Sequence, residues 1–486
     1  MKLKFSGFYG DVMLTSVVEI AVLFGFFITY RLLAFFWGPD GVGVYSLIRR
    51  AIGLFQPFLF LGLGVGLSRY LAVAKDVAQR RGYLQAGGYA IFIFTLFFVV
   101  VVNLFRESFA SFVFGSPSYE RLVISFSMLL VGLVLHGLVY SFFRGALKVK
   151  SFNLLQIINM GLVPIIVIFV VQGKSIEVLI FTTGLWTFIG GTFFSLYFIK
   201  DIIAPVVGIT RHFKELMAYS LPRFAGDMVL AGLFSFGPIL AAHVMAIRDV
   251  GYLSISQSLL SSVGAVIAPL GLVLLPKVSK LMAEGRENEI KKNINLLTEA
   301  IIQCSVFLCI QMIFFSDTIV LYWLGLDFIE AVPIIRITFL ALLFYCFYVA
   351  FRSILDAVKI TPINTINLGI ALAVFVGLSF LAISLKGFSI LIGMSVAFSL
   401  ALVCLGLLTY YSVRKIYPEG VDRDVAGLKT AVLINALIAG ATFSVKSLIG
   451  GHIYLLIPYE AITALIYLAI LYRLRVKWVT EAIRLF

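Results

Sequence analysis

Arginine side chains occur inside the long apolar stretches of this chain, where a charge is costly. Arg31, Arg49 and Arg50 fall in the first two stretches, and Arg223 opens the seventh. A charge near the bilayer centre costs about 2.5–3.5 kcal/mol on insertion scales. Because a guanidinium stays protonated and its planar fork grips two phosphate oxygens, we expect these arginines to line a wet cavity that binds an anion, unless they snorkel to the headgroups. Neighbours on a helix point about 100° apart, so Arg49 and Arg50 cannot both face such a cavity squarely.

Two acidic residues also lie in apolar stretches. Glu19 and Asp227 each sit well inside an expected helix. Arg223 precedes Asp227 by four residues, which allows an ion pair on one helix face. Glu19 has no basic residue three or four positions away, so its partner must come from another helix, from water or from a proton. Because an acid in such a place is a usual relay for H⁺ or Na⁺, both are candidates for ion coupling, with structural pairing as the alternative.

A repeat with an offset of 208 residues relates two parts of the chain. Arg144 recurs as Arg352, and Glu19 recurs as Asp227. The same offset relates Val42 to Val250, Gly43 to Gly251, Ser46 to Ser254, Tyr140 to Tyr348, Phe143 to Phe351, Leu147 to Leu355, Asn159 to Asn367 and Gly161 to Gly369. A shared offset indicates a duplicated unit, because chance matches would scatter in register. Duplicated halves are the usual build of secondary transporters.

The composition indicates which elements position these residues. The chain is 61% hydrophobic and 13% charged, with a mean hydropathy of +1.07, whereas soluble domains have about 25% charged residues. A hydrocarbon core needs roughly 20 apolar residues per helix, and about 14 such runs can be read. The runs are long and continuous, which favours helices over barrel strands. We therefore predict an all-α polytopic membrane protein with about 14 transmembrane helices.

The lysine and arginine positions predict the topology. With the N-terminus in the cytoplasm, most basic residues fall in inner loops and in a tail with Arg473, Arg475, Lys477 and Arg484. This asymmetry, rather than nucleic-acid binding, accounts for the net charge of +14, and it places both termini inside. No cleavable signal is expected, because the first apolar run is too long. The four cysteines all fall within apolar runs, which indicates packing positions rather than disulfides or a metal site.

The repeat also predicts the organisation of the helices. Its offset covers six spans, an even number, so the two copies have the same orientation across the membrane. We expect a six-helix bundle at 1–212, a second six-helix bundle at 213–415, and a further two-helix hairpin with a basic cytoplasmic tail at 416–486. The two bundles are expected to flank a central cleft.

Three short motifs resemble those of a known family. They are Gly38-Pro39-Asp40-x-x-Gly43-x-Tyr45-Ser46, Leu61-Gly62-Leu63-Gly64 leading to Ser68-Arg69-Tyr70, and Phe142-Phe143-Arg144-Gly145-Ala146-Leu147-Lys148. Their order and the expected helix layout are similar to those of the O-antigen type (Wzx-like) polysaccharide flippases, in the multidrug/oligosaccharidyl-lipid/polysaccharide exporter superfamily. The resemblance covers most of the chain. It implies a non-enzymatic transporter of the cell membrane that moves polyprenyl-(pyro)phosphate-linked oligosaccharide from the inner to the outer leaflet by alternating access.

The resemblance also implies roles for the charged residues and for partners. The cavity arginines would bind the anionic lipid-linked glycan, while its polyprenyl tail stays in the bilayer. Arg144 and Arg352 would receive the pyrophosphate at the inner mouth, with anchoring at the headgroups as the alternative. No cofactor is implied beyond H⁺ or Na⁺ for coupling. A monomer suffices, and association with polysaccharide assembly enzymes fits the same role.

Other functions remain open at this point. A cation-coupled multidrug exporter of the same superfamily would want an acidic cleft, whereas the spans hold more arginine than acid. A peptidoglycan lipid precursor is an alternative cargo. A membrane-bound glycosyl transferase would need paired carboxylates on an aqueous loop, and the loop expected to carry Asp317, Asp327 and Glu330 looks too short and apolar. A scaffold without transport would not need charges inside its spans.

Overall fold

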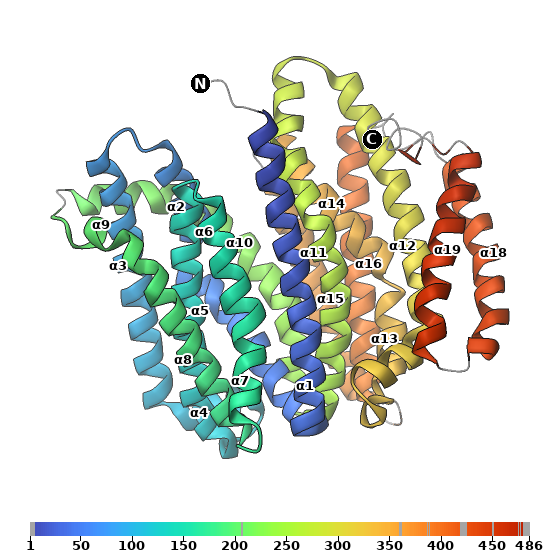
Figure 1. The fold of residues 1–486 in the computed structure, drawn as a ribbon, viewed down its shortest axis with the longest axis horizontal. Coiled ribbons are helices and arrows are strands. Elements are labelled where there is room, and N and C mark those ends of the chain that lie inside the picture. The colour runs from blue at the N-terminus through green and yellow to red at the C-terminus, as the bar shows by residue number, and fades with distance from the viewer. Residues whose placement is uncertain are drawn as a thin grey trace. The chain divides into compact units, whose positions relative to one another are not determined.

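The secondary structure of the described residues is helical throughout, as Figure 1 shows. The computed structural model describes residues 5–205, 208–358, 362–385, 387, 389–417, 425–449, 452–474, 476, 478 and 479. The predicted all-α fold is confirmed. Arg475, Lys477 and Arg484 of the predicted basic tail lie outside the described residues.

The chain divides into two compact units, Met1–Ser254 and Ile255–Phe486. The first contains α1 (Phe5–Phe60), α2 (Leu63–Val73), α3 (Val77–Leu104), α4 (Arg106–Phe114), α5 (Glu120–Gly145), α6 (Val149–Gln156), the π-helix η2 (Ile157–Leu162), α7 (Val163–Val171), α8 (Ile176–Ser195), α9 (Ile199–Ile203), α10 (Ile209–Ala241) and the start of α11 (Ile247–Ala283). The second contains the rest of α11, then α12 (Glu287–Trp323), α13 (Ala331–Phe339), α14 (Leu342–Val358), α15 (Ile363–Ser384), α16 (Ile390–Ile416), α18 (Val425–Ile449) and α19 (Ile453–Arg473).

Helix α1 folds back on itself at Gly38, where the backbone leaves helical geometry (φ 62°, ψ −167°). The hydroxyls of Tyr30 and Ser46 are 3.1 Å apart, and the ring centroids of Tyr30 and Tyr45 are 5.9 Å apart. An unbroken helix would separate residues 16 positions apart by about 24 Å. The two halves of α1 are therefore packed side by side, and they correspond to two of the expected spans.

Successive passes of the first unit alternate in direction, which gives this unit two ends. At one of them α1 begins, α2 finishes and α3 begins (Figure 1). This basic end carries Lys75, Arg80, Arg81, Lys148, Lys150, Lys200, Arg211 and Lys214. The opposite end, where α3 finishes and α5 begins, carries Arg106, Arg121, Lys174 and Arg248. Lysine and arginine therefore gather at one end of the unit, in the pattern from which the topology was predicted.

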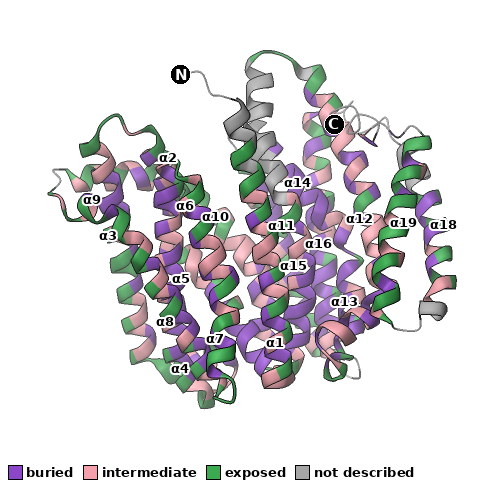
Figure 2. Cartoon of the chain, viewed as in Figure 1, coloured by how far each residue is buried: buried purple, intermediate pink, exposed green. Residues whose placement is uncertain are grey.

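Burial separates the inner from the outer helices of the first unit (Figure 2). Most of α5 is buried, including Phe126 and Leu130, and it forms the core of this unit. In contrast, α3 exposes Phe92, Phe97 and Leu104, whose exposed fractions are 62%, 68% and 73%. An exposed face of large apolar side chains is the surface that lipid chains cover in a multi-pass membrane protein.

In the second unit, the α18–α19 hairpin is tied to α12 by polar contacts. The Nζ atom of Lys446 donates to Oδ2 of Asp317 over 2.7 Å, and the Tyr467 hydroxyl donates to the backbone oxygen of Gln303 over 3.0 Å. Asp317 lies within α12, so the prediction that it belongs to a loop is wrong. The helix continues because apolar residues follow Asp317 as far as Trp323, and a lysine of α18 supplies the counter-charge.

Repeated residues occupy matching environments in the two units. Phe143 and Phe351 are both fully buried. Nδ2 of Asn159 donates to the backbone oxygen of Thr187 on α8, and Nδ2 of Asn367 donates to Oγ of Ser412 on α16. In both units the asparagine therefore bonds to the helix that follows its own, as expected of duplicated elements.

The number of spans is smaller than predicted when each continuous helix counts once. The described residues contain 11 helical segments long and apolar enough to cross a membrane, or up to 12 if the pair α13–α14, bent by 52°, is one span. Met13–Phe60 counts once although it folds back at Gly38. The apolar stretch Val432–Lys446 of α18 is shorter than a full span. The count of about 14 therefore stays a prediction.

Candidate functional site

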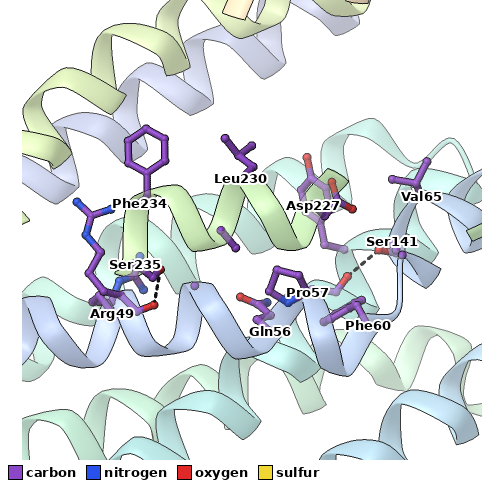
Figure 3. A pocket seen from close by; sticks show the side chains of 17 residues that line it. Arg49, Gln56, Pro57, Phe60, Val65, Ser141, Asp227, Leu230, Phe234 and Ser235 are labelled. Carbon is purple, nitrogen blue, oxygen red and sulfur yellow. Dashed lines mark hydrogen bonds between the residues drawn. The ribbon is translucent and has the colours of Figure 1, made fainter. Parts of the chain in front are cut away.

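A cavity of about 570 Å³ lies within the first unit, between the second half of α1, α2, α5 and α10 (Figure 3). Its volume is in the range of pockets for drug-sized ligands. The lining mixes cationic, acidic, amide, hydroxyl and aromatic side chains: Arg49, Arg50, Gln56, Pro57, Phe60, Val65, Tyr140, Ser141, Asp227, Leu230, Phe234 and Ser235, with several glycines and Ala231.

A break between α1 and α2 shapes one wall of this cavity. Pro57 lies in the last turn of α1, and Leu61 and Gly62 follow with positive φ values of 47° and 73°. A Cβ at Gly62 would lie 2.5 Å from the backbone oxygen of Ser220, and one at Gly66 would lie 2.2 Å from its Oγ. Glycine at both positions therefore lets α2 pack directly against α10.

Arg50 is held in place by the protein. Its Nη2 donates to the backbone oxygen of Ser254 over 3.0 Å, and its Cζ lies 5.9 Å from the centroid of the Phe234 ring. Its own backbone oxygen accepts from Oγ of Ser235 over 2.8 Å, a bond drawn in Figure 3. Arg50 therefore serves to join α1 to α10 and α11 as well as lining the cavity.

Arg49 differs from its neighbour. Its residue is exposed, and no described residue forms a hydrogen bond or an ion pair with its side chain. It lies within electrostatic range of Tyr45 and His136. Nε2 of His136 lies 3.0 Å from Oε1 of Gln156, so this histidine makes an interhelical contact. The N–H donors of the Arg49 guanidinium therefore make no hydrogen bond with a described residue, and this residue lines the cavity.

The two acidic candidates lie in different places. Asp227 on α10 lines the cavity. Glu19 does not line it, and is half-buried on the first half of α1. It is within electrostatic range of Tyr140, which does line the cavity. Tyr140 was not predicted to line the cavity, although it is one of the residues of the repeat.

The remaining predicted residues do not line the cavity. Arg31 and Arg144 are exposed, and Arg144 lies within electrostatic range of Tyr140. Arg352 belongs to the second unit, where its backbone oxygen accepts from Nδ2 of Asn364 over 2.7 Å. Arg223 is exposed, and its Cζ lies 4.0 Å from the ring centroid of Tyr219.

The lining points to binding rather than to covalent chemistry. Two arginines and one aspartate line the cavity, together with hydroxyl and amide side chains. Such a set can hold a phosphate group by charge-assisted hydrogen bonds and sugar hydroxyls by neutral ones. Among the described residues, no group of three His, Cys, Asp or Glu side chains could hold a metal ion, and the four cysteines are free.

Residues 10–282 match the family described as polysaccharide biosynthesis protein. No curated protein is a detectable sequence relative of this chain. This match confirms the predicted resemblance to a polysaccharide family, and solved structures of the same fold are also found.

Three of these structures are helical membrane transporters. A lipid II flippase MurJ in an inward closed conformation is 18% identical with a TM-score of 0.71, over 94% of this chain and 99% of that chain. An inward-facing multidrug resistance MATE family transporter of the MOP superfamily is 13% identical with a TM-score of 0.69, over 84% of this chain and 99% of that chain. The bent form of the MATE transporter VcmN from Vibrio cholerae is 12% identical with a TM-score of 0.52, over 87% of this chain and 99% of that chain. At these identities the likeness establishes the fold.

Proposed function

Because the chain belongs to the polysaccharide biosynthesis protein family, we propose that it is a flippase for an anionic, lipid-linked glycan. The cargo is a polyprenyl-(pyro)phosphate-linked oligosaccharide or polysaccharide repeat unit. It moves from the inner to the outer leaflet of the cell membrane by alternating access of the two halves. The tail stays in lipid while the charged head crosses in a wet cavity, so no covalent step is needed.

The observation that carries this proposal is the state of Arg49. Arg49 lines a cavity whose described lining residues include two arginines and one carboxylate. No described residue forms a hydrogen bond or an ion pair with the guanidinium of Arg49. A charge inside a membrane span is costly, and a cavity that serves a cationic ligand would favour acids instead. A phosphate group would supply the missing counter-charge, with the guanidinium fork donating to two of its oxygens.

The direction of transport rests on the distribution of charge. Under the positive-inside rule, we propose that the basic end of the first unit faces the cytoplasm and that both termini lie on that side. Arg144 and Arg352 then lie toward the inner surface, where either could meet the cargo. Glu19 and Asp227 are the proposed relays for H⁺ or Na⁺, since an acid inside a span is a usual carrier of a coupling ion.

Two other cargoes are considered because of the fold. The likeness to a lipid II flippase supports a peptidoglycan lipid precursor as the alternative cargo. The likeness to a multidrug resistance transporter supports a cation-coupled drug exporter. The cavity holds more arginine than acid among its lining residues, and this favours the anionic cargoes.

The test is export in a strain that lacks its own glycan flippase. Arg49→Ala removes the free guanidinium, so export should fall at least about tenfold, since a hydrogen bond to a charged group contributes ~1.5–3 kcal/mol. Surface glycan is measured with the amount of protein in the membrane held equal. Arg121→Ala is the matched control, because Arg121 is exposed at the opposite end of the unit. Wild-type export by the Arg49 variant would refute the proposal.

A further inference from the structure

Two arginines flank one tyrosine in the first unit, outside the residues that line the cavity. The Cζ atom of Arg69, on α2, lies 4.2 Å from the ring centroid of Tyr219, and the Cζ atom of Arg223 lies 4.0 Å from it. The two guanidinium carbons are thus no more than 8.2 Å apart, the sum of these distances. Nη1 of Arg223 also donates to the backbone oxygen of Tyr219 over 3.1 Å, which fixes its orientation. We call these three residues the Arg–Tyr–Arg cluster.

The cluster adjoins the cavity on the side of the basic end. Arg69 follows the lining residue Val65 by one turn of α2, toward the finish of this helix at the basic end. Arg223 precedes the lining residue Asp227 by one turn of α10, which starts at the basic end. A ligand that enters the cavity from this end therefore passes the cluster before it reaches Arg49.

The two arginines of the cluster form no ion pair within the described part of the chain. Other arginines of the basic end have carboxylate partners: Arg80 and Arg81 bind Asp201, and Arg211 binds Glu215. Neither Arg69 nor Arg223 has a described carboxylate within ion-pair distance. Both side chains are exposed, so a ligand can reach them. Two like charges so close repel each other, and an anion between or beside them removes that repulsion.

An aromatic row extends from the cluster. The Tyr70 ring meets the Tyr219 ring edge-on at 5.9 Å, and the Tyr83 ring lies 4.9 Å from Tyr70. Tyr70 and Tyr219 are partly exposed, and their rings offer an apolar face that suits a sugar ring attached to a phosphate, whereas Tyr83 is buried and its hydroxyl donates to Oε2 of Glu215. A plain pair of surface arginines would lack this neighbour.

We propose that the Arg–Tyr–Arg cluster is an anion site that takes the phosphate group of a lipid-linked ligand at the entrance of the cavity, ahead of Arg49. This inference rests on the proposed function, to which it adds an entry site. Tyr219 orients the two guanidinium groups through its ring, and their free donors bind phosphate oxygens. The ligand class is a prenyl mono- or diphosphate. A phospholipid headgroup carries the same chemistry and is the competing source.

The experiment measures binding of farnesyl diphosphate to the full-length protein in phosphatidylcholine nanodiscs by microscale thermophoresis. Arg69→Ala and Arg223→Ala should each raise the Kd at least about tenfold, since each removes charge-assisted hydrogen bonds. Tyr219→Leu should weaken binding as well, because the guanidinium groups lose the ring that orients them. Arg121→Ala, at the opposite end, is the matched control and should bind as wild type does.

The outcomes separate this inference from the proposed function. If both cluster variants bind like wild type while Arg49→Ala does not, the cluster is not a phosphate site and the flippase proposal stands. If phosphatidylglycerol in the nanodiscs removes the difference between wild type and the cluster variants, the cluster serves bilayer headgroups and the assignment to cargo is overturned. If wild type itself does not bind farnesyl diphosphate, the cluster proposal fails, and the export assay decides separately on the flippase.

Discussion

Residues 42–57 and their repeat, residues 250–265, start alike and then diverge. Val42 and Val250 are both fully buried, as are Ser46 and Ser254. Three and four positions later, the first copy has Arg49 and Arg50, whereas the second has Gln257 and Ser258. The residues that pack at the start of each copy are therefore retained, while the charges occur in the first copy alone.

Residues of the second copy are packed closely where residues of the first copy line the cavity. Gln257 is fully buried, and neither its Nε2 nor its Oε1 has a hydrogen-bond partner among the described residues. Gln56 of the first copy lines the cavity, whereas its counterpart is Gly264, where a Cβ would lie 2.6 Å from the ring of Tyr345. The duplicated scaffold thus carries a cationic cavity in one copy and close packing in the other. Duplication supplies the framework, and side-chain differences between the copies supply the site.

The largest expected effect concerns Glu19 and Asp227, which are equivalent positions with different surroundings. Glu19→Gln should abolish the dependence of transport on an imposed H⁺ or Na⁺ gradient, because the neutral amide carries no ion. The measurement is flipping in proteoliposomes with and without the gradient, beside Asp227→Asn. If Glu19→Gln retains the wild-type gradient dependence, this residue is not the relay, and an effect of Asp227→Asn alone would move the role to the cavity.

A charge placed in the second copy should be the next largest effect. Gln257→Arg puts an uncompensated cation at a fully buried position, and the stability loss should be about 3–5 kcal/mol. Thermal unfolding in detergent micelles would report it as a lower Tm. Gln257→Leu is the control, since it removes two unpaired polar atoms and should be neutral or stabilising. A stable, folded Gln257→Arg protein would mean that the second copy tolerates the charge of the first.

The smallest effect distinguishes the adjacent arginines. Arg50→Gln removes the bond to the Ser254 backbone oxygen, so stability should fall by about 1.5–3 kcal/mol. Arg49→Gln removes no bond with a described residue, so its stability should change by less than about 0.5 kcal/mol. Comparison of the two Tm values checks this. Equal losses would contradict the assignment of Arg50 to structure and of Arg49 to ligand.

The sequence predicted the helical class and the repeat because both depend on features spread over many residues. Hydropathy marks each long run, and a constant offset marks the duplication. A polar surrounding for Arg49 could also be proposed from the sequence, since any charge within a span calls for one.

The geometry of the cavity depends on contacts that no local pattern encodes. The positive φ of Leu61 follows from the approach of α2 to α10, and side-chain rules do not anticipate it for leucine. The spacing of Arg223 and Asp227 allowed an ion pair, whereas the guanidinium of Arg223 packs on Tyr219, four residues before it. A helical arginine can contact the residue four positions before it or four positions after it. Which of the two Arg223 contacts depends on the packing of α2, which brings Arg69 to the ring of Tyr219.

The contact of Gly62 and Gly66 with Ser220 has a consequence for engineering. An alanine Cβ at either position would press on Ser220 of α10, so we expect such a substitution to move α2 away from α10. Substitution of Gly62 or Gly66 would therefore change the width of the cavity, and with it the size of the ligand head group that fits, while every charged residue stays in place.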